Sequence, residues 1–566
     1  MPNGLLLWNI RLIPFDPSSP RLFGFAEFLA GLALMVVAWT VAGVRYRFRL
    51  RTAPLPLIGI TFAIMSVVGV LTLLTDLWRA QAWPVPEGNL LTPATWQAIL
   101  GFLSLVTFLS WAWFGFIRPS RFGRVNARRY ALTLYRAIAF GSPSELSTIA
   151  TEFTRSVRPI VRYATEKRIR HGEENDKPPE KVPVLAQYAN DMLRLIGDKR
   201  FCHAIVESSP GTAGAVFQEM ADAAKYRIPV GPFARNVVSE ALAHKNSFLF
   251  HEVEGYESGL IGAVKPLSRA MFSNFRLVES VGTLLDPDAD KWDATQWGAY
   301  CRVVLIAFRD YAAKDFWSHS FTLYRAKERI ERAASDLYRL NGSATAGWEE
   351  DAYARLRIVV DFIVEAVEVL DQIGVPKGVK LRVREHRTSA ATFYDHLAKM
   401  MFEVIFSASQ VRSPSDLSWS VQHNAVWSEF FSFAKLTGAA GKMIKFKLRR
   451  LLYDEIVQMK DFPNYKGAKI LAFCLNVMGL RIHEKNSLNV DSLALQKAVL
   501  SWTRKNFARL HTYNSRVMLA GFVENMSYNE AAQQIVKEYV AGLDREPPRD
   551  VFTVVRDSTG DIPTGK

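Results

Sequence analysis

The chain has 566 residues, of which 49% are hydrophobic and 22% charged, and its formal net charge is +15. This composition excludes extensive disorder, and the length exceeds that of one ordinary core, so we expect several structural units. The first 130 residues carry 12 Arg, no Lys and 4 acidic residues, hence +8, and the other 436 residues carry the remaining +7. A positive excess beside apolar runs favours a lipid partner over a nucleic-acid partner. The three cysteines form no CxxC pair, which fits a reducing compartment.

Three apolar segments dominate the first 120 residues, at about 22–44, 55–77 and 96–117. Each is roughly 22 residues long, enough at ~1.5 Å per residue to cross a hydrocarbon core of ~30 Å. The second and third carry no charge in their interiors, and the first has only Glu27, near its start. We therefore predict a membrane domain of three spans at 22–117 that follows an external N-terminal segment at 1–21.

The distribution of arginines predicts how these spans are oriented. Four arginines alternate with Tyr46, Phe48 and Leu50 in the first loop, and five follow the third span. The loop between the second and third spans has one Arg and one Glu. By the positive-inside rule the two basic segments are cytoplasmic, so the N-terminus is outside and the C-terminal part inside. The arginines expected to set this topology and to contact anionic lipid are Arg45, Arg47, Arg49, Arg51, Arg118, Arg121, Arg124, Arg128 and Arg129.

Small and polar residues recur along the third predicted span. Gly101, Ser104, Thr107 and Ser110 are spaced three apart and stay on one face of a helix. Such a face is favoured where helices pack or where water enters. Two interpretations stay open: the face packs on the other two spans of the same chain, or it lines a pore formed by several chains.

From Ala127 onward the apolar residues follow the period of an α-helix. The stretch Ser142 to Glu145 is a capping box with Pro143 at the first turn, so a helix is expected to begin there. The polar stretch "VGTLLDPDADKWDATQW" divides two helical subdomains, at 118–280 and 281–542, and a flexible tail follows at 543–566. The best strand candidate is "GVKLRVREHRT", at 378–388. The predicted fold class is all-α.

Local motifs for metal binding or catalysis are incomplete in this sequence. The acidic loop that begins at Asp286 has the first, third and fifth carboxylates of a calcium loop, but Lys291 and Trp297 stand where glycine and a bidentate carboxylate are needed. His244 and His251 flank "KNSFLF" without an HExxH motif or a cysteine partner. We therefore predict no catalytic residue, no metal and no cofactor.

Two helical segments carry further candidate residues. Arg504 and His511 have six residues between them, a spacing that resembles the Arg…His motif of helical ribonuclease domains of the HEPN type; the alternative is an exposed helix face. The most basic helix could form a surface for anionic lipid or nucleic acid, or its charges could pair with acidic neighbours. Its basic residues are Lys442, Lys445, Lys447, Arg449 and Arg450.

Together these patterns predict a multi-pass protein of a bacterial inner membrane with a large helical cytoplasmic part for interaction, sensing or regulation. The expected partners are the bilayer, including its anionic lipids, further copies of the chain, and a cytoplasmic protein or small ligand. We expect no nucleic-acid partner. The alternatives are an oligomeric channel or membrane-permeabilising effector gated by the cytoplasmic part, and a membrane-tethered nuclease or other hydrolase.

Reporter fusions test the predicted topology. Fusions after Arg51 and after Arg129 should give a cytoplasmic signal, and a fusion near Glu87 should give an external one, because the Lys/Arg bias sets orientation. Neutral replacement of all four arginines of the first loop should weaken or scramble this pattern. A cytoplasmic signal near Glu87 would overturn the orientation.

Overall fold

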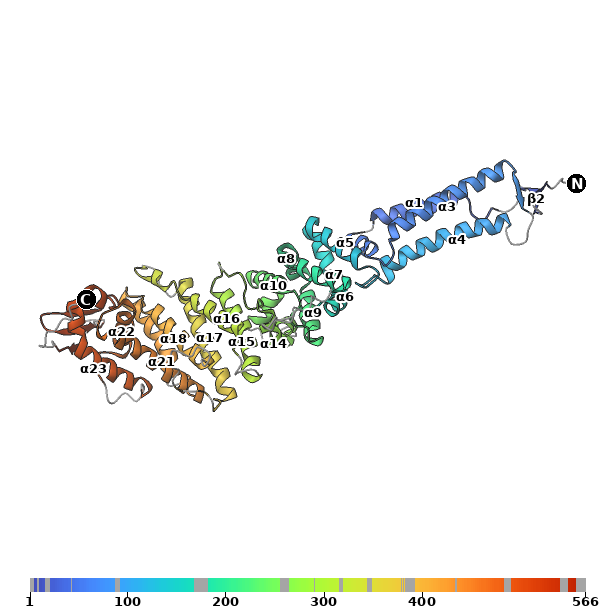
Figure 1. The fold of residues 1–566 in the computed structure, drawn as a ribbon. Coiled ribbons are helices and arrows are strands. Elements are labelled where there is room, and N and C mark those ends of the chain that lie inside the picture. Colours follow the sequence, from blue (N-terminus) through green and yellow to red (C-terminus); the bar gives the residue numbers. More distant parts are fainter. Residues whose placement is uncertain are drawn as a thin grey trace, which may run out of the picture. The chain divides into compact units, whose positions relative to one another are not determined.

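The computed structural model describes the whole chain apart from seventeen short stretches (Figure 1). These are residues 1–4, 8–9, 16–20, 42, 87–91, 167–181, 255–263, 290, 315–318, 344–348, 378, 380, 382–391, 433–434, 483–489, 540–547 and 556–566. The chain forms two compact units, 1–240 and 241–566. This division lies ahead of the subdomain boundary predicted at 280/281.

The described residues are predominantly helical, as predicted, but they also form two three-stranded antiparallel sheets. The all-α prediction therefore describes the bulk of the chain and misses a small sheet near each end. The predicted strand at 378–388 lies almost entirely outside the described residues.

The first unit begins with the apolar helices and a small sheet. In chain order its elements are β1 (Leu5–Leu7), β2 (Ile10–Pro14), α1 (Phe25–Val41), α2 (Val44–Arg51), α3 (Leu57–Ala80), β3 (Pro84–Pro86), α4 (Pro93–Ala112) and the π-helical turn η1 (Trp113–Ile117). Figure 1 shows α1, α3 and α4 side by side, and each of the three contacts the other two.

Two helices are long and apolar enough to cross a membrane: α3, and the continuous helix formed by α4 and η1. They match the second and third predicted spans. The first predicted span, 22–44, is not one uninterrupted helix, because α1 ends at Val41 and α2 starts at Val44. Gly43 between them has an extended backbone, which ends a helix. The 17 residues of α1 cover about 26 Å, somewhat less than a ~30 Å hydrocarbon core.

An apolar cluster holds the three helices together. It contains Phe28 of α1, Met65 and Val68 of α3, and Leu100 of α4. A second cluster lies where α2 meets the chain around it, and it includes Leu50, Leu57 and Trp111. These clusters bury one side of each helix and leave the opposite side apolar and exposed.

The start of α1 is fixed by polar groups from two other segments. Glu27, Asp76 and Gln97 each accept a hydrogen bond from a backbone N–H within residues 22–25. Arg21 also donates to Asp76, at 2.7 Å. Beside them β2 pairs with β1 and β3, so the segment predicted only as external contributes a hairpin to a sheet. Proline occupies both ends of β3, so its sequence does not predict a strand.

The rest of the first unit is helical. Its helices are α5 (Ala127–Phe140), α6 (Pro143–Tyr163), α7 (Val184–Leu195), α8 (Lys199–Ser208), α9 (Pro210–Asp222) and α10 (Gly231–Ala243), within which the division between the units falls. The capping box predicted at the start of α6 is confirmed: the Ser142 hydroxyl accepts from the Glu145 N–H, and the Glu145 carboxylate accepts from the Ser142 N–H. Helices α7, α8 and α9 pack against α6.

The second unit is a larger helical assembly that ends in a sheet. Its first helices are α11 (Phe248–Val253), α13 (Pro266–Phe272), α14 (Phe275–Val281), α15 (Ala294–Lys314), α16 (Phe321–Arg332), η2 (Leu337–Leu340), α17 (Asp351–Ile373) and α18 (Phe393–Ala408). There follow α19 (Ser415–Trp419), η5 (Ser420–Trp427), α20 (Ser428–Phe431), α21 (Ala439–Val457), η6 (Gln458–Lys460), α22 (Tyr465–Met478), α23 (Val490–Tyr513) and α24 (Ser515–Met518). The closest helix pairs are α15 with α17 and α18 with α21.

The C-terminal sheet lies partly in the region predicted as a flexible tail. Strands β4 (Met526–Asn529), β5 (Gln534–Glu538) and β6 (Arg549–Thr553) pair in that order. Lys537 of β5 is only 2% exposed. Its ammonium donates to the Asn476 carbonyl at 2.7 Å and lies over the rings of Trp419 and Tyr539, at 4.6 and 5.1 Å. One buried lysine thus ties the sheet to α19 and α22.

The stability of the second unit should depend on pH through Lys537. Burial lowers the pKa of this lysine to about 8, from an ordinary value of 10.5. Between these pH values the unfolded chain holds a proton that the folded chain has lost, so the free energy of unfolding rises with pH in this window. Relative to Lys537→Met, the rise should be on the order of 3 kcal/mol.

Urea unfolding of a fragment of residues 231–566, followed by circular dichroism from pH ~7.5 to ~10, measures this difference. The comparison with Lys537→Met removes the contribution of other titrating groups. A difference that stays constant over the whole window contradicts the assignment.

Candidate functional site at the arginine-rich junction

The arginine-rich stretch of the first predicted loop folds as helix α2. Alternating basic and apolar residues are compatible with a loop or an edge strand, but a helix buries Phe48, Arg49 and Leu50 together on one side. The Phe48 ring meets the Tyr130 ring of α5 edge to face, with 5.7 Å between their centroids. Arg45, Arg47 and Arg51 are exposed. Helix α2 therefore has one arginine inside the protein and three at its surface.

Arg49 makes a buried ion pair with Glu152 of α6. Its Nε and Nη2 atoms donate to the two carboxylate oxygens of Glu152, at 2.8 and 2.7 Å, and its Nη1 donates to the Gly115 carbonyl at 3.1 Å. The side chains of Arg49 and Glu152 are 8% and 4% exposed. The hydrogen bonds that the Arg49 guanidinium donates to this carboxylate raise the pKa of the guanidinium. Arg49, predicted to contact lipid, is thus an internal residue that joins three segments of the chain.

The structure brings the two predicted basic segments together. The Asn126 amide donates to the Thr52 carbonyl at 2.7 Å, and Arg129 donates to the Pro54 carbonyl. The Phe122 N–H donates to the Ser156 hydroxyl of α6, at 3.1 Å. These bonds hold the end of α2 against the chain that follows η1. Arg118, Arg121, Arg124 and Arg128 from that chain are exposed.

Glu152 is shared by a second arginine. The Arg45 Nε lies 3.3 Å from its Oε1 atom, and the Arg45 side chain is 47% exposed. Two guanidinium groups therefore face one buried carboxylate, which leaves one positive charge in excess at this point. Because Arg45 is near the surface, solvent partly screens its charge. Arg49 is buried, so Glu152 is the counter-charge on which it depends.

A cavity of about 370 Å³ lies between α2, α5 and α6. Three guanidinium groups line it, from Arg47, Arg51 and Arg136, together with one carboxylate, from Glu145. That carboxylate is already used in the capping box of α6. Neither Arg51 nor Arg136 has a hydrogen bond or ion pair with any part of the chain that the structure describes. Two of the three arginines in the lining, Arg51 and Arg136, therefore have no counter-charge among the described residues.

Helix α5 presents apolar side chains to its exposed side beside this cavity. Leu132, Tyr135 and Phe140 are all largely exposed, and Phe140 reaches 81%. Arg128 and Arg136 lie on the same side of the helix. A helix that exposes aliphatic, aromatic and basic residues together is typical of a membrane–water interface.

The small and polar face of α4 meets the other apolar helices. A side chain at Gly101 would come within 3.2 Å of the Phe23 ring. The Ser104 hydroxyl lies 3.8 Å from the Met65 sulfur of α3. Thr107 is buried and donates to the Leu103 carbonyl of its own helix, whereas Ser110 is half-buried. Three of these four residues thus have defined surroundings within one chain.

Arg504 and His511 have separate aromatic partners. Arg504 is exposed and its guanidinium lies over the Phe552 ring, at 5.4 Å. His511 is buried among Phe507 and Tyr528, and this burial lowers its pKa. The two side chains therefore contact different residues, and each helps to hold α23 on the C-terminal sheet.

The basic helix α21 turns two of its five cations inward. Lys445 and Lys447 are buried, and Lys447 donates to Asp395 of α18 at 2.6 Å. Arg450 lies 3.6 Å from Asp454, one turn along the same helix. The exposed basic surface of this helix is thus smaller than the sequence suggests.

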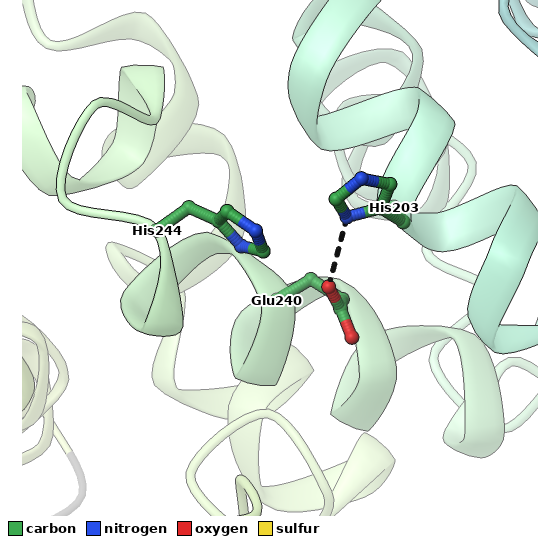
Figure 2. Close-up of side chains that lie close together, drawn as sticks. All are labelled: His203, Glu240 and His244. Carbon is green, nitrogen blue, oxygen red and sulfur yellow. Dashed lines mark hydrogen bonds and ion pairs between the residues drawn. The ribbon is translucent and has the colours of Figure 1, made fainter.

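Other potential metal ligands include His203, His244 and the nearby acidic residues Glu240 and Glu252. Figure 2 shows His203 of α8 bonded to Glu240 of α10, with 3.1 Å between Nδ1 and a carboxylate oxygen. His244, also drawn there, belongs to the second unit. Within the first unit this pair offers two ligand atoms, fewer than the three or four protein ligands of zinc sites. In the second unit Glu252 accepts from the N–H groups of Leu267 and Ser268 and so caps α13.

Comparisons with known proteins identify no relative. No protein family matches the chain, and no curated protein or solved structure is significantly similar to it.

Sequence reasoning missed two residues of this junction, Glu152 and Arg136. Glu152 carried one signal: it lies within the apolar face of α6, next to Ile149 and Phe153, where an unpaired carboxylate is costly. Arg136 gave none, because an arginine on an amphipathic helix is ordinary. Only the fold shows that both face α2.

Glu152→Gln should destabilise the protein strongly, because it leaves Arg49 buried without a counter-charge. We expect a loss of about 3–5 kcal/mol in unfolding free energy, seen as a lower thermal midpoint in detergent. Glu219→Gln is the matched control, since Glu219 pairs with the half-exposed Arg162 and such pairs contribute about 0–1 kcal/mol.

The double variant Arg49→Met with Glu152→Leu should be more stable than Glu152→Gln, because no buried charge is left unpaired. Equal midpoints for Glu152→Gln and Glu219→Gln would show that the pair is not buried in solution.

Proposed function

We propose that this chain is a membrane-anchored interaction or regulatory protein, in which three spans carry a helical cytoplasmic part. The observation that carries the proposal is the buried ion pair between Arg49 and Glu152. It connects α2, which follows the first apolar helix, to α6, around which the next helices pack. A buried ion pair between these two helices suits a protein that holds a folded helical part in a fixed position next to its membrane anchor.

The third span of the proposal is α1. It packs against α3 and α4, and its outward side exposes Leu29, Leu34, Val36 and Val37. Large apolar side chains on the outside of a helix are favourable against lipid and unfavourable against water. A helix slightly shorter than the hydrocarbon core is accommodated by local thinning of the bilayer or by long flanking side chains. The basic residues of α2 then lie at the cytoplasmic face, which supports the orientation predicted from the arginines.

The anchor reading is preferred over a channel because of the surroundings of α4. Gly101 and Ser104 lie against Phe23 and Met65 of the same chain, and Thr107 is buried, which supports packing within one chain. The nuclease alternative has no comparable support, since His511 is buried among aromatic rings. A cytoplasmic protein, a small ligand or a second copy of the chain stays the expected partner of the helical part.

Substitutions on α4 separate the anchor from the channel. Ser104→Leu and Thr107→Leu should lower the yield of folded protein, because larger side chains there overpack the contact with α3, at a typical cost of about 1–3 kcal/mol. Neither should change ion flux in liposomes. Leu105→Ile, on the outward side of the same helix, is the control and should leave the yield unchanged.

Ligand-free wild-type protein should show no flux above empty liposomes. The opposite result would be ion flux through the wild-type protein that either substitution abolishes without lowering the yield of folded protein. That result would support a pore and contradict the anchor proposal.

A further inference from the structure

We propose that the cavity between α2, α5 and α6 binds the phosphate headgroup of an anionic lipid from the cytoplasmic leaflet. The inference rests on the proposed function in one respect, namely that α2 and α5 lie at the bilayer surface. It goes further by assigning a binding site, a ligand class and the residues that recognise it.

The charge of the cavity favours an anion. Arg47, Arg51 and Arg136 face one carboxylate, Glu145, so the lining has a net charge of +2 (three minus one). Arg51 and Arg136 have no partner among the described residues, and Glu145 is already bound at the start of α6. Guanidinium groups bind phosphate through two parallel N–H···O bonds, and such charge-assisted bonds are about twice as strong as neutral ones.

The size of the cavity suits a headgroup. Its volume of about 370 Å³ falls at the lower end of the ~300–1,000 Å³ range of small-molecule sites. A phosphate with a glycerol fits this space, whereas an oligonucleotide or a folded protein surface does not. The polar lining is contributed by three different helices, so a ligand there touches all of them.

The apolar part of the lining favours a lipid over a free phosphate ion. Phe48, Phe140 and Ile149 line the cavity beside the arginines. The Phe140 side chain is 81% exposed, and Leu132 and Tyr135 are exposed along the same side of α5. A soluble anion gains nothing from these groups. An acyl chain that leaves the headgroup does, because it keeps this side of α5 in contact with hydrocarbon.

Position along the chain gives a third argument. Helix α2 connects α1 to α3, and Arg51 precedes the first residue of α3 by only six positions. The opposite, buried side of α2 carries Arg49, which is bonded to Glu152. A headgroup in the cavity therefore contacts the surface side of the same short helix whose inner side is bonded to α6.

The test uses the full-length chain in phosphatidylcholine nanodiscs, with fluorescent phosphatidylglycerol as the probe. The double variant Arg51→Gln with Arg136→Gln should bind the probe at least about tenfold more weakly than wild type, because two charge-assisted bonds are lost. The control is Arg155→Gln with Arg227→Gln, which removes the same charge from exposed positions that lie outside the cavity and outside the predicted lipid-contacting arginines. It should change binding less than about twofold.

Three outcomes would overturn the proposal: no preference of wild type for phosphatidylglycerol over phosphatidylcholine, equal losses in the two double variants, or displacement of the probe by glycerol 3-phosphate at concentrations comparable to the lipid. The second indicates diffuse electrostatic attraction, and the third indicates a site for a soluble phosphate. Each can occur while the reporter fusions still support the three-span topology, so failure of this site is distinguishable from failure of the anchor proposal.

Discussion

The first unit depends on a single buried contact between residues 103 positions apart, the bidentate pair of Arg49 and Glu152. A buried ion pair adds little net stability, since the desolvation of both charges offsets most of their attraction. The ion pair instead selects one arrangement of α2 over others. Any arrangement of α2 that misses Glu152 leaves a guanidinium or a carboxylate unpaired in an apolar setting, and this penalty fixes how α2 lies against α6.

The same constraint explains why α2 has two different sides. Once Phe48, Arg49 and Leu50 turn inward, Arg47 and Arg51 are left exposed, and Arg45 reaches Glu152 from the surface. Arg47 and Arg51 then meet Arg136 around one cavity, although like charges repel and nothing in their local sequence requires them to converge. An anion bound between them would relieve this repulsion. The internal ion pair and the external cavity both result from the orientation of α2.

Buried cations recur in the second unit, where they tie elements together. Lys447 joins α21 to α18 through Asp395, and Lys537 joins β5 to α22 through a backbone carbonyl. Part of the positive charge of this chain is therefore internal. Net charge describes attraction to anionic partners only for the side chains that reach the surface. The basic helix α21 illustrates the difference, because its sequence suggests a surface that its packing partly buries.

The sequence by itself determined what depends on local patterns: the helical class, the two long apolar helices, the capping box of α6, and the clustering of arginines around the apolar segments. Helical periodicity, span length and capping involve residues within a few turns of each other. The tertiary structure decided what depends on distant partners. It placed Arg49 inside and Arg51 outside, paired β6 within the expected tail, joined β2 to β3, and brought Arg136 to α2. Residues such as Arg49 and Arg51 are indistinguishable in sequence, because they differ only in which distant segment lies beside them.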